Sequence, residues 1–454
     1  MPTSLPLIIP VENQLRELDA KLLLAVCAAN AGITSYLGYR TEIDINITKF
    51  PRSLYMAKSF THRSDKMFRI LSKLGHIICA WDEEALVHYP ADIYFTRRLS
   101  PDALKYVSHI FAWGLENEEL LHSYPELPKE MPIHKVGNPR LDMLRNELKP
   151  FYKEQIDRIS QEHGDFILIN TNFGNVNAHL PIHNLFIHDK KGSGFGTMTR
   201  GSAGMTREFA EGREKYKQLI FKKFTELIPY LASSLPETKF IIRPHPVENQ
   251  NTYLDFATTF ENVEVVREGN VIPWIYAARL LIHSGCTTGI EAYISKNDAI
   301  AYTPVSDDRY GYDAILPNAL SHNYASADAV LTAIKTSTRN EIDDSILHHY
   351  LQFDEQRLCS TKIVDFIENI AIQGKSVNYP EYIHGWLLAN KRGLIKKIKG
   401  LSKKSKYHQS FQEVRFPTLD AELLNRQANQ FAELIGYETK IQLKQVSPHI
   451  FLVQ

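Results

Sequence analysis

The segment Lys239–Asn249 carries an apolar run that passes straight into Arg243, Pro244, His245 and Pro246. A guanidinium and an imidazole hold phosphate oxygens by charge-assisted hydrogen bonds, and proline stiffens the turn that presents them. A proline-rich strand exit with a capped histidine would give the same sequence. We expect this turn to hold a nucleotide phosphate because a second segment matches it.

The second segment follows another apolar run and consists of small hydroxyl residues. Ser284, Thr287 and Thr288 come where a helix, Thr288–Ile294, is expected to begin. Hydroxyl groups and the free backbone N–H groups of a helix start both favour an anion. Glu291 falls one turn into this helix, where a carboxylate can bind ribose hydroxyls. An ordinary Ser/Thr cap with an acidic first turn is the alternative.

Carboxylates gather after an apolar run in the first part of the chain, at Asp82, Glu83 and Glu84. Three adjacent carboxylates repel one another, which raises the pKa of at least one of them and suits a general base. A solvated acidic turn is the alternative. Glu12 ends the first apolar run and Arg16 follows one helical turn later, where both would position the substrates. A charged helix start is the alternative there.

Two further segments supply candidate contacts to a nucleotide donor. Asn172 belongs to the polar turn Thr171–Asn177, whose amides can bind sugar hydroxyls. The backbone around Val271–Trp274, which includes Ile272 and Trp274, is expected to hold the base.

The elements that must position these residues alternate between strand and helix, which predicts parallel, doubly wound sheets. The expected strands are residues 5–11, 34–38, 76–81, 106–112, 134–136, 165–170, 263–266, 280–283 and 299–302, with another ending at Arg243. The expected helices are residues 15–31, 64–74, 150–160, 208–228, 288–294, 326–336 and 360–372. Residues 137–142 are expected to form a turn, and the glycine-rich residues 191–204 a mobile loop.

A chain of 454 residues is too long for one ordinary core. We predict an α/β fold with two Rossmann-like, doubly wound parallel-sheet domains that face a central cleft. Residues 1–150 would form a domain that binds the acceptor of a transferred group. Residues 151–375 would form a domain that binds its nucleotide donor. Residues 376–454 would form a helical, basic tail that packs back on the first domain. Ligands of open α/β sheets bind beyond the carboxyl ends of the strands, where all the candidate residues fall.

Composition excludes several classes of function. The net charge is zero, so nothing draws the whole chain to nucleic acid. Four scattered cysteines favour reduced thiols in the cytoplasm over a structural zinc. The sequence lacks an apolar run of the roughly 18 residues that span a membrane, and its start does not resemble a secretion signal. It also lacks the DxD, HExxH, GxSxG and GxxxxGK[ST] motifs, so we expect neither a metal nor a cofactor.

The segment Lys391–Lys406 carries eight basic residues and no acidic one. Such a segment can hold a protein at an anionic membrane surface, and a solvated linker is the alternative. We expect a cytoplasmic protein with peripheral contact at the cytoplasmic face of the inner membrane.

Several motifs resemble those of bacterial GT-B sialyltransferases, and related sets occur in transferases that use CMP-Kdo. Glu83-Glu84-Ala85 resembles their paired acidic motif, whose second acidic residue is the base, although that family has glycine in place of Ala85. His245-Pro246 resembles the motif that holds the CMP phosphate. Thr287-Thr288 resembles the paired hydroxyl motif at the same phosphate.

Residues 5–305 more closely resemble bacterial surface carbohydrate biosynthesis proteins. The residues that carry this resemblance are Glu12, Arg16–Asp19, Asp82–Glu84, Gly137–Asp142, Arg243–Pro246, Cys286–Thr288 and Glu291. Gly137–Arg140, Asp142 and the two phosphate turns also resemble CDP-glycerol-dependent teichoic acid polymerases. Both resemblances imply a cytidine nucleotide and the same phosphate clamp, and they differ in the transferred group.

The resemblance implies a GT-B transferase that moves a 2-keto-3-deoxy sugar acid, of the Kdo or nonulosonate kind, from its CMP conjugate. The acceptor would be a surface glycan or a lipid-linked oligosaccharide, and Glu83 or Glu84 would deprotonate its hydroxyl. Three alternatives stay open: a CDP-glycerol transferase, a sugar-nucleotide 2-epimerase that needs a UDP-sugar, and a non-catalytic GT-B scaffold that only binds nucleotide.

Overall fold

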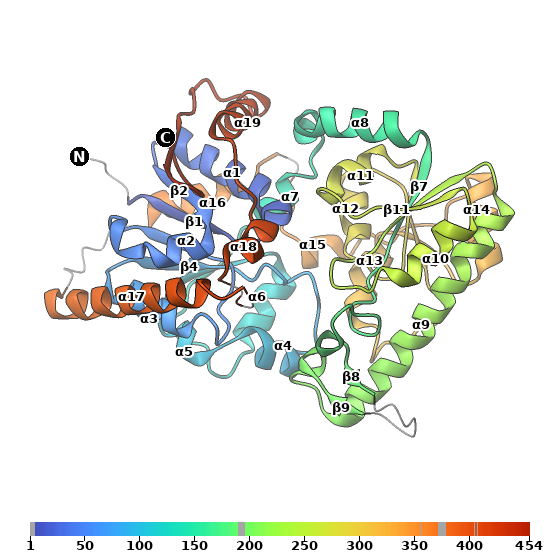
Figure 1. The fold of residues 1–454 in the computed structure, drawn as a ribbon, viewed down its shortest axis with the longest axis horizontal. Coiled ribbons are helices and arrows are strands. Elements are labelled where there is room, and N and C mark those ends of the chain that lie inside the picture. Colours follow the sequence, from blue (N-terminus) through green and yellow to red (C-terminus); the bar gives the residue numbers. More distant parts are fainter. Residues whose placement is uncertain (1–4, 189–195, 355, 371–377, 404, 406) are drawn as a thin grey trace. The chain divides into compact units, whose positions relative to one another are not determined.

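The computed structural model describes the chain except for residues 1–4, 189–195, 355, 371–377, 404 and 406, and the side chains of residues 414 and 415. The chain divides into two compact units, drawn in Figure 1. Unit 1 comprises residues 1–85, 98–151 and 348–454, and unit 2 comprises residues 86–97 and 152–347. The division after residue 151 lies next to the expected one. Residues 348–375, which were expected in the second domain, group with unit 1 instead.

Unit 1 is built on one eight-stranded sheet in the order β15-β16-β2-β1-β3-β4-β5-β6. The six strands from β2 to β6 in this order run parallel to one another. Strand β16 pairs antiparallel with β2, and β15 pairs antiparallel with β16. The strands are β1 (Leu7–Val11), β2 (Ser35–Tyr39), β3 (Leu54–Ala57), β4 (Ile77–Ala80), β5 (Val107–Ala112), β6 (Ile133–Lys135), β15 (Leu443–Ser447) and β16 (Ile450–Val453). Every residue of β1 and β3 is buried, as in parallel strands covered on both faces.

Helices cover both faces of this sheet. Figure 1 shows α1, α16 and α19 on one side and α3, α5 and α17 on the other. The helices of unit 1 are α1 (Gln14–Asn30), α2 (Arg40–Ile45), α3 (Asp65–Lys73), α5 (Pro101–Leu104), α6 (Leu115–His122), α7 (Pro139–Asp142), α16 (Cys359–Asn369), α17 (Tyr379–Gly400), α18 (Gln409–Arg415) and α19 (Ala421–Leu434). The 3-10 turns are η1 (Ile47–Lys49) and η2 (Asn146–Tyr152), and α15 (Leu347–Tyr350) lies at the boundary between the units.

Unit 2 is built on a six-stranded parallel sheet in the order β11-β10-β7-β12-β13-β14. Its strands are β7 (Phe166–Asn170), β10 (Lys239–Arg243), β11 (Val263–Val265), β12 (Leu280–His283), β13 (Ala299–Tyr302) and β14 (His322–Tyr324). A separate hairpin pairs β8 (Phe186–Ile187) with β9 (Thr197–Met198). The helices are α4 (Ala91–Arg98, which ends one residue past the boundary), α8 (Lys153–His163), α9 (Arg207–Ser234), α10 (Asn251–Thr259), α11 (Val271–Ala277), α12 (Thr288–Ile294), α13 (Ile315–Ala319) and α14 (Ala327–Thr336), with 3-10 turns η3 (Pro181–His183), η4 (Arg200–Ser202) and η5 (Tyr312–Ala314).

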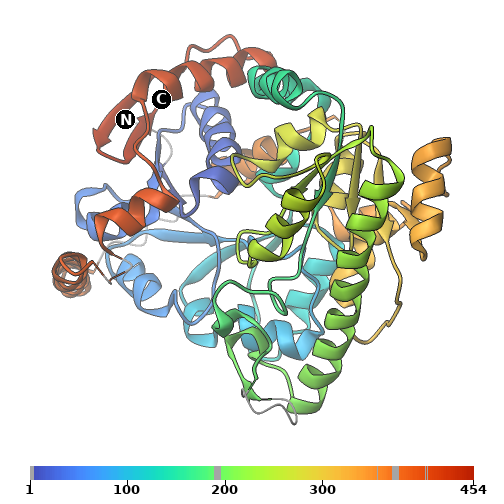
Figure 2. The ribbon, with the colours of Figure 1, turned by 45° about the vertical axis from the view of Figure 1, so that its right-hand side comes forward.

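Each face of the unit 2 sheet has its own apolar core. On one face, Phe224 and Leu231 of α9 pack with Tyr253 of α10 and Val330 of α14. Figure 2 shows the long α9, in green, lying along this unit. On the other face, Ile159 of α8 packs with residues of α11 and α12. Both expected sheets are therefore present, and the α/β fold with two Rossmann-like domains is confirmed.

The structure differs from the expected elements at several places, and β3 and β14 are strands that were not expected. Within the expected turn 137–142, residues Pro139–Asp142 form the short helix α7, because the Asn138 side chain accepts a hydrogen bond from the Arg140 N–H and caps its start. The tail is not only helical, since β16 pairs with β2 and extends the first sheet. Part of the expected mobile loop 191–204 lies outside the described residues, and its later part forms β9 and η4.

Candidate functional site

Three neighbouring strands of unit 2 direct their carboxyl ends to the same edge of the sheet. The next strand of this sheet along the chain, β10, lies on one side of β7, and β12 lies on the other. Strand order therefore reverses at β7, which is where open α/β sheets bind ligands. The loops at this edge are residues 171–174 after β7, residues 244–250 after β10 and residues 284–287 after β12.

The buried carboxylate of Glu248 ties two of these loops together. Its Oε1 accepts hydrogen bonds from the Thr171 hydroxyl at 2.7 Å, the Phe173 N–H at 3.0 Å and the His245 N–H at 3.2 Å. Its Oε2 accepts from the Tyr253 hydroxyl at 2.5 Å. Burial raises the pKa of Glu248, while these donors act to lower it. Glu248, which the sequence analysis did not single out, fixes the backbone that presents His245.

The tautomer of His245 follows from its own turn. Its Nδ1 accepts a hydrogen bond from the Val247 N–H at 3.3 Å, so the proton of the neutral ring sits on Nε2. The next residue, Pro246, is exposed, and its carbonyl accepts a hydrogen bond from Arg267 at 2.7 Å. His245 is thus held as an N–H donor at the edge where an anion is expected.

Arg243 has a different role from the one the sequence predicted. Its guanidinium donates to the carbonyls of Glu268 at 2.7 Å and Gly269 at 3.1 Å, and it stacks over Trp274 at 4.8 Å. Burial lowers its pKa to about 10, so it remains a cation at neutral pH. These contacts make Arg243 a positioning residue for the loop that leads into α11.

The residues expected to hold the base are packed into the protein. Trp274 is buried and lies 6.0 Å from the Phe166 ring and 5.1 Å from the His163 ring, measured between centroids. Ile272 is also buried, and its N–H donates to the Asn270 side chain, which caps α11. Their side chains thus contribute to packing, and only backbone groups of this segment remain as candidates for base contacts.

A hydrogen-bonded relay through buried His283 holds the loop after β12. Nδ1 of His283 accepts from the Cys286 N–H at 3.3 Å, and Nε2 lies 2.9 Å from the Ser321 hydroxyl, which donates to the Pro317 carbonyl. Burial lowers the pKa of His283 to about 3, so the ring stays neutral. Sequence analysis missed this residue because it reads as the last position of an apolar strand.

Two glycines allow this loop to approach its neighbours closely. Gly285 has a φ of 67°, and a Cβ there would lie 2.6 Å from the Ala314 Cβ. A Cβ at Gly289 would lie 2.4 Å from the His283 ring nitrogen. Substitution at either position would push the hydroxyl residues Ser284, Thr287 and Thr288 out of place.

The site residues named from sequence after β7 and β12 come together at this edge. Asn172 donates to the Gly285 carbonyl at 3.4 Å and so joins the two loops. The buried Thr288 hydroxyl has no hydrogen-bond partner in the described part of the chain. Burial raises the pKa of the Cys286 thiol, and the nearby Glu291 raises it further. Helix α12 has seven residues, so its dipole alone is a weak anion site.

Asn170 provides an independent sign of a ligand. It is the last residue of β7 and is only 3% exposed. Neither its amide nitrogen nor its amide oxygen has a hydrogen-bond partner in the described part of the chain. Buried polar groups in native proteins are normally satisfied, so this amide is a candidate for a ligand contact.

A buried excess of positive charge lies next to the loop after β12. Arg213 and Lys217 of α9 both pair with Asp313, at 2.6 Å and 3.0 Å. Burial lowers the pKa of Lys217, whereas the two cations outweigh burial and hold the pKa of Asp313 well below its usual range. Two cations thus face one carboxylate beside Ala314, the residue against Gly285. This charge favours an anion at the loop.

In unit 1, charged side chains follow four neighbouring strands, β2, β1, β3 and β4. Glu17 is the centre of the network and accepts from the Glu12 N–H at 3.0 Å, from Lys21 at 2.7 Å and from Lys58 at 2.7 Å. Glu12 pairs with Lys58 and with Arg40, both at 3.1 Å. Sequence analysis found Glu12 and gave no role to Glu17 or Lys21 of α1, and it missed Lys58 and Arg40, which only the sheet order brings to Glu12.

Opposite charges keep this network ionised. Burial acts to raise the pKa of Glu12, but the charges of Lys58 and Arg40 outweigh it and lower that pKa. The same balance, with Lys21 and Lys58 as the cations, holds the pKa of Glu17 well below its usual range. Burial opposes the charge of Lys58, but Glu17 and Glu12 raise its pKa.

The three adjacent carboxylates each have a separate cation. Asp82 forms a two-pronged ion pair with Arg98, and Glu84 lies 3.7 Å from Arg16. Glu83 is 6% exposed and lies 3.5 Å from Lys21. The mutually repelling cluster that we expected from sequence is therefore wrong, because the chain turns each carboxylate in a different direction.

Glu83 is buried like Asp82 but is not held by a two-pronged ion pair. Its Oε2 is buried and has no hydrogen-bond partner among the described residues. Glu84 has a side chain that is 41% exposed, and Asp82 is fixed by Arg98. Within the described residues there is no group of three or more His, Cys, Asp and Glu side chains arranged to hold a metal.

The motif Gly137–Asp142 has a structural role in unit 1. Asp142 is buried and accepts from the N–H groups of Cys359 and Ser360, at 2.7 Å and 2.8 Å, and from the Ser360 hydroxyl at 2.7 Å. Gly137 has a φ of 81°, and a Cβ there would lie 2.4 Å from the Cys359 sulfur. The motif thus docks the start of α16 onto the first sheet.

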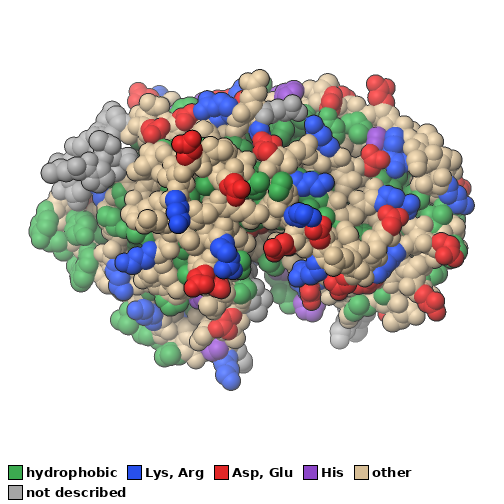
Figure 3. Space-filling view, turned by 90° about the horizontal axis from the view of Figure 1, so that it is seen from above, with side chains coloured by type: hydrophobic (Ala, Val, Ile, Leu, Met, Phe, Trp, Pro, Cys, Tyr) green, Lys and Arg blue, Asp and Glu red, His purple; other side chains and the backbone are tan. Residues whose placement is uncertain are grey.

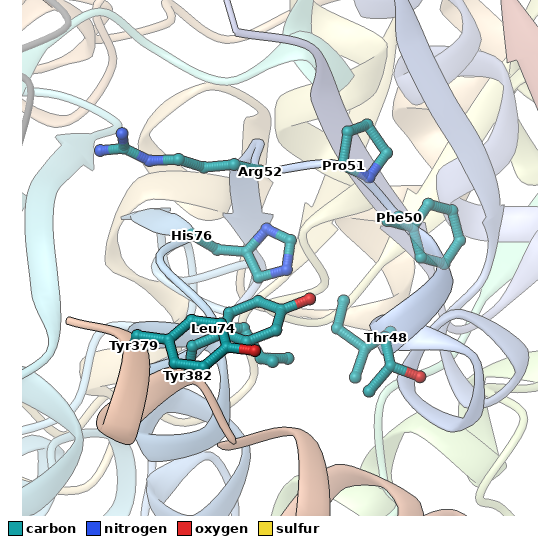
Figure 4. A pocket seen from close by; sticks show the side chains of 9 residues that line it. Thr48, Phe50, Pro51, Arg52, Leu74, His76, Tyr379 and Tyr382 are labelled. Atoms are coloured by element: carbon teal, nitrogen blue, oxygen red, sulfur yellow. The ribbon is translucent and has the colours of Figure 1, made fainter. Parts of the chain in front are cut away.

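A separate pocket of about 340 Å³ lies at the opposite edge of the same sheet. Residues that precede β3 and β4, among them Phe50, Arg52 and His76, line it together with Tyr379 and Tyr382 of α17 (Figure 4). Burial lowers the pKa of His76 to about 4. The pocket is at the amino ends of the strands and shares no residue with the charged network.

Comparison with known proteins gives the fold. A scan against models of protein families finds no match, and a search of curated protein sequences finds none either. Among solved structures, UDP-GlcNAc 2-epimerase from Methanocaldococcus jannaschii, in complex with UDP-GlcNAc and UDP, matches with a TM-score of 0.50 and 12% identity, over 80% of this chain and 99% of that one. The fold is GT-B-like.

Weaker similarities were found to two other structures. A variant of the wall teichoic acid polymerase TagF matches with a TM-score of 0.49 and 11% identity, over 83% of this chain and 90% of that one. UDP-GlcNAc 2-epimerase from Neisseria meningitidis, bound to UDP-GlcNAc, matches with a TM-score of 0.46 and 13% identity, over 80% and 99% of the two chains. At such identities the likeness describes the GT-B-like fold alone.

Proposed function

We propose that this chain is a glycosyltransferase of surface polysaccharide synthesis that uses a cytidine nucleotide donor. It moves a 2-keto-3-deoxy sugar acid of the Kdo or nonulosonate kind from its CMP conjugate to a glycan or lipid-linked oligosaccharide. The observation that carries the proposal is the unsatisfied Asn170 amide at the point where strand order reverses. Donors from His245 and from the hydroxyl loop gather at the same edge.

Unit 2 binds the donor in this proposal. The phosphate of CMP takes hydrogen bonds from Nε2–H of His245 and from the hydroxyls of Ser284, Thr287 and Thr288. Asn170 and Asn172 contact the sugar, and Glu291 contacts the ribose. The leaving CMP carries negative charge, so preorganised N–H and hydroxyl donors lower the barrier for its departure. Arg243 and Glu248 act by positioning these groups.

Unit 1 supplies the general base. We assign this role to Glu83, whose buried Oε2 is available to accept a proton from an acceptor hydroxyl. Lys21, at 3.5 Å, keeps Glu83 oriented. Glu84, which is more exposed and pairs with Arg16, is the other candidate. Glu12 belongs to the network that fixes Lys58 and Arg40, so its contribution is to hold the site in shape.

A thermal-shift titration with CMP, CDP, UMP and UDP tests the donor assignment. Selective stabilisation by CMP supports the proposal, because a ligand that binds only the folded state raises the melting temperature. His245→Ala should weaken CMP binding by roughly 10- to 100-fold, as expected for a charge-assisted hydrogen bond. His122→Ala, an exposed residue at the end of α6, is the matched control. Unchanged CMP affinity in His245→Ala would exclude the site.

One second candidate has support from the fold. A UDP-sugar 2-epimerase is favoured by the match over 80% of this chain to UDP-GlcNAc 2-epimerase. In that case UDP would stabilise the protein more than CMP, and UDP-GlcNAc would be consumed without an acceptor. A preference for CDP would instead indicate a glycerophosphate donor, and CMP binding without donor turnover a nucleotide-binding scaffold.

A further inference from the structure

Helix α17 packs one face onto unit 1. Gly385 and Gly393 let it approach closely, since a Cβ at Gly385 would lie 2.7 Å from the Lys73 Cβ and one at Gly393 would lie 3.2 Å from the Ile45 carbonyl. Ala389 is also buried on this face. The helix therefore has a fixed orientation on α3 and α2, and its opposite face is defined.

The opposite face of α17 is apolar and exposed. Leu387, Leu394 and Leu401 are 55%, 60% and 83% exposed. They recur every seven residues, so they form one stripe along the helix, to which Ile383 and Ile398 belong by helical spacing. Trp386 and Tyr379 are exposed beside it. An apolar stripe of this length on a surface helix marks an interaction site.

The exposed charged residues of α17 after its first turn are all positive. Lys391, Lys397, Lys399 and Lys403 are exposed. The acidic residue of α17, Glu381, pairs with Lys73 of α3. The charge is smaller than the sequence implied, because Arg392 and Lys396 turn inward and bind Asp44 at 3.2 Å and 3.1 Å. The outer face of α17 therefore combines apolar side chains with lysines, and the carboxylate of this helix, Glu381, is already paired with Lys73.

We infer that this face of α17 docks on an anionic lipid surface. Helices that lie in the plane of a membrane interface pair an apolar stripe with flanking lysines, whose stems extend to the lipid headgroups. Trp386 and Tyr379 suit the headgroup region, where aromatic rings with a polar edge accumulate. Figure 3 shows hydrophobic side chains, with lysine and arginine side chains among them, on the side where Figure 1 places α17.

Charge selects this partner over a second copy of the chain. Two copies packed through the stripe would bring lysines of the same sign together, which destabilises the pair. An anionic bilayer offers the complementary charge. In the described residues no helix is long and apolar enough to cross a membrane, so the proposed contact is peripheral.

Vesicle sedimentation with the full chain tests the inference. The protein should sediment with vesicles that contain phosphatidylglycerol and remain in the supernatant with pure phosphatidylcholine, and salt should weaken the binding. The variant Leu387→Gln, Leu394→Gln, Ile398→Gln should lose sedimentation. The variant Lys391→Gln, Lys397→Gln should bind about fivefold more weakly for each lysine removed.

The controls separate docking from misfolding. Leu219→Gln, Leu254→Gln changes two equally exposed leucines on α9 and α10, and its binding to vesicles should equal that of the wild type. Circular dichroism should be the same for all variants, because the substituted residues are exposed. No sedimentation with anionic vesicles would overturn the inference, and so would a triple variant that still binds. Dimers of the wild type that the triple variant lacks would assign the stripe to a second copy instead.

Discussion

The polar residues at the strand ends of unit 1 are matched by opposite charges, whereas those at the strand ends of unit 2 are not fully matched. In unit 1, Glu12, Glu17 and Glu83 are matched by Lys21, Lys58 and Arg40, and the network neutralises itself. In unit 2, Asn170 is unsatisfied and two buried cations face a single carboxylate. A self-neutralised network preserves geometry without a ligand, whereas an unsatisfied edge gains from binding one. The proposed function rests on this difference, with nucleotide binding in unit 2 and proton transfer in unit 1.

The largest effect is expected on turnover. Glu83→Gln should reduce the rate of sugar transfer by about 10²- to 10⁴-fold, the usual range for a general base. Its CMP affinity should stay within about twofold of the wild type because the nucleotide binds to unit 2. The measurement is steady-state transfer together with a CMP titration. Glu84→Gln is the matched variant, and full activity of Glu83→Gln with loss in Glu84→Gln would move the base to Glu84.

Glu17→Gln should lower the free energy of unfolding by about 3 kcal/mol, because it removes the carboxylate that Lys21 and Lys58 share and leaves each lysine with one partner, Glu83 or Glu12. Urea denaturation measures this, with Glu119→Gln on the surface of α6 as a control that changes it by less than about 0.5 kcal/mol. The pKa of Glu17 is depressed in the folded protein. Its stabilisation is therefore present at neutral pH and lost as pH falls below the ordinary glutamate range. A variant as stable as the wild type would show that the network is not cooperative.

In unit 2, Glu248→Ala should cost about 3 kcal/mol of stability, because it leaves the N–H groups of Phe173 and His245 without a hydrogen-bond acceptor. It should also weaken CMP binding, since His245 loses its fixed backbone. Glu248→Gln keeps an oxygen at the position of Oε1 and should lose much less. If both variants bound CMP like the wild type, His245 would not depend on this carboxylate.

The smallest effect concerns Asp142. Burial raises its pKa to about 6, so between the ordinary aspartate range and pH 6 the folded state binds more protons than the unfolded state. Stability should therefore fall as pH rises through this window, by up to about 1.4 kcal/mol per pH unit. Asp142→Asn should remove that slope in denaturation curves recorded from pH 4 to 7, and an unchanged slope would assign it to another group.

Much of the fold could be predicted from sequence, because buried parallel strands are continuous apolar runs and helix ends carry recognisable residues. The structure has α12 at Thr288–Ile294, as expected, and glycines end α1 and α3 with positive φ at Gly32 and Gly75. The strand β16 was not predicted because its partner β2 is more than 400 residues away. Such distant pairings leave no local pattern in the sequence.

Site residues could be predicted only where a residue type suited to ligand binding stood at the end of an apolar run. His245 and the hydroxyl loop stand out because polar residues end apolar runs. Glu248, His283 and Asn170 do not, since each is a polar residue inside a segment that otherwise reads as structural. Arg243 shows the limit of residue type alone: it suits a phosphate, but its guanidinium also donates to the carbonyls of Glu268 and Gly269, contacts that the sequence did not indicate.

The pairing of β16 with β2 means that the first sheet can be completed only late in synthesis. All of unit 2 leaves the ribosome before residues 450–453, which cover the open edge of β2. Until then the first sheet exposes an unpaired strand, which is a template for pairing with another chain. Loss of β16 would therefore harm solubility during expression more than any single substitution on the surface of unit 2.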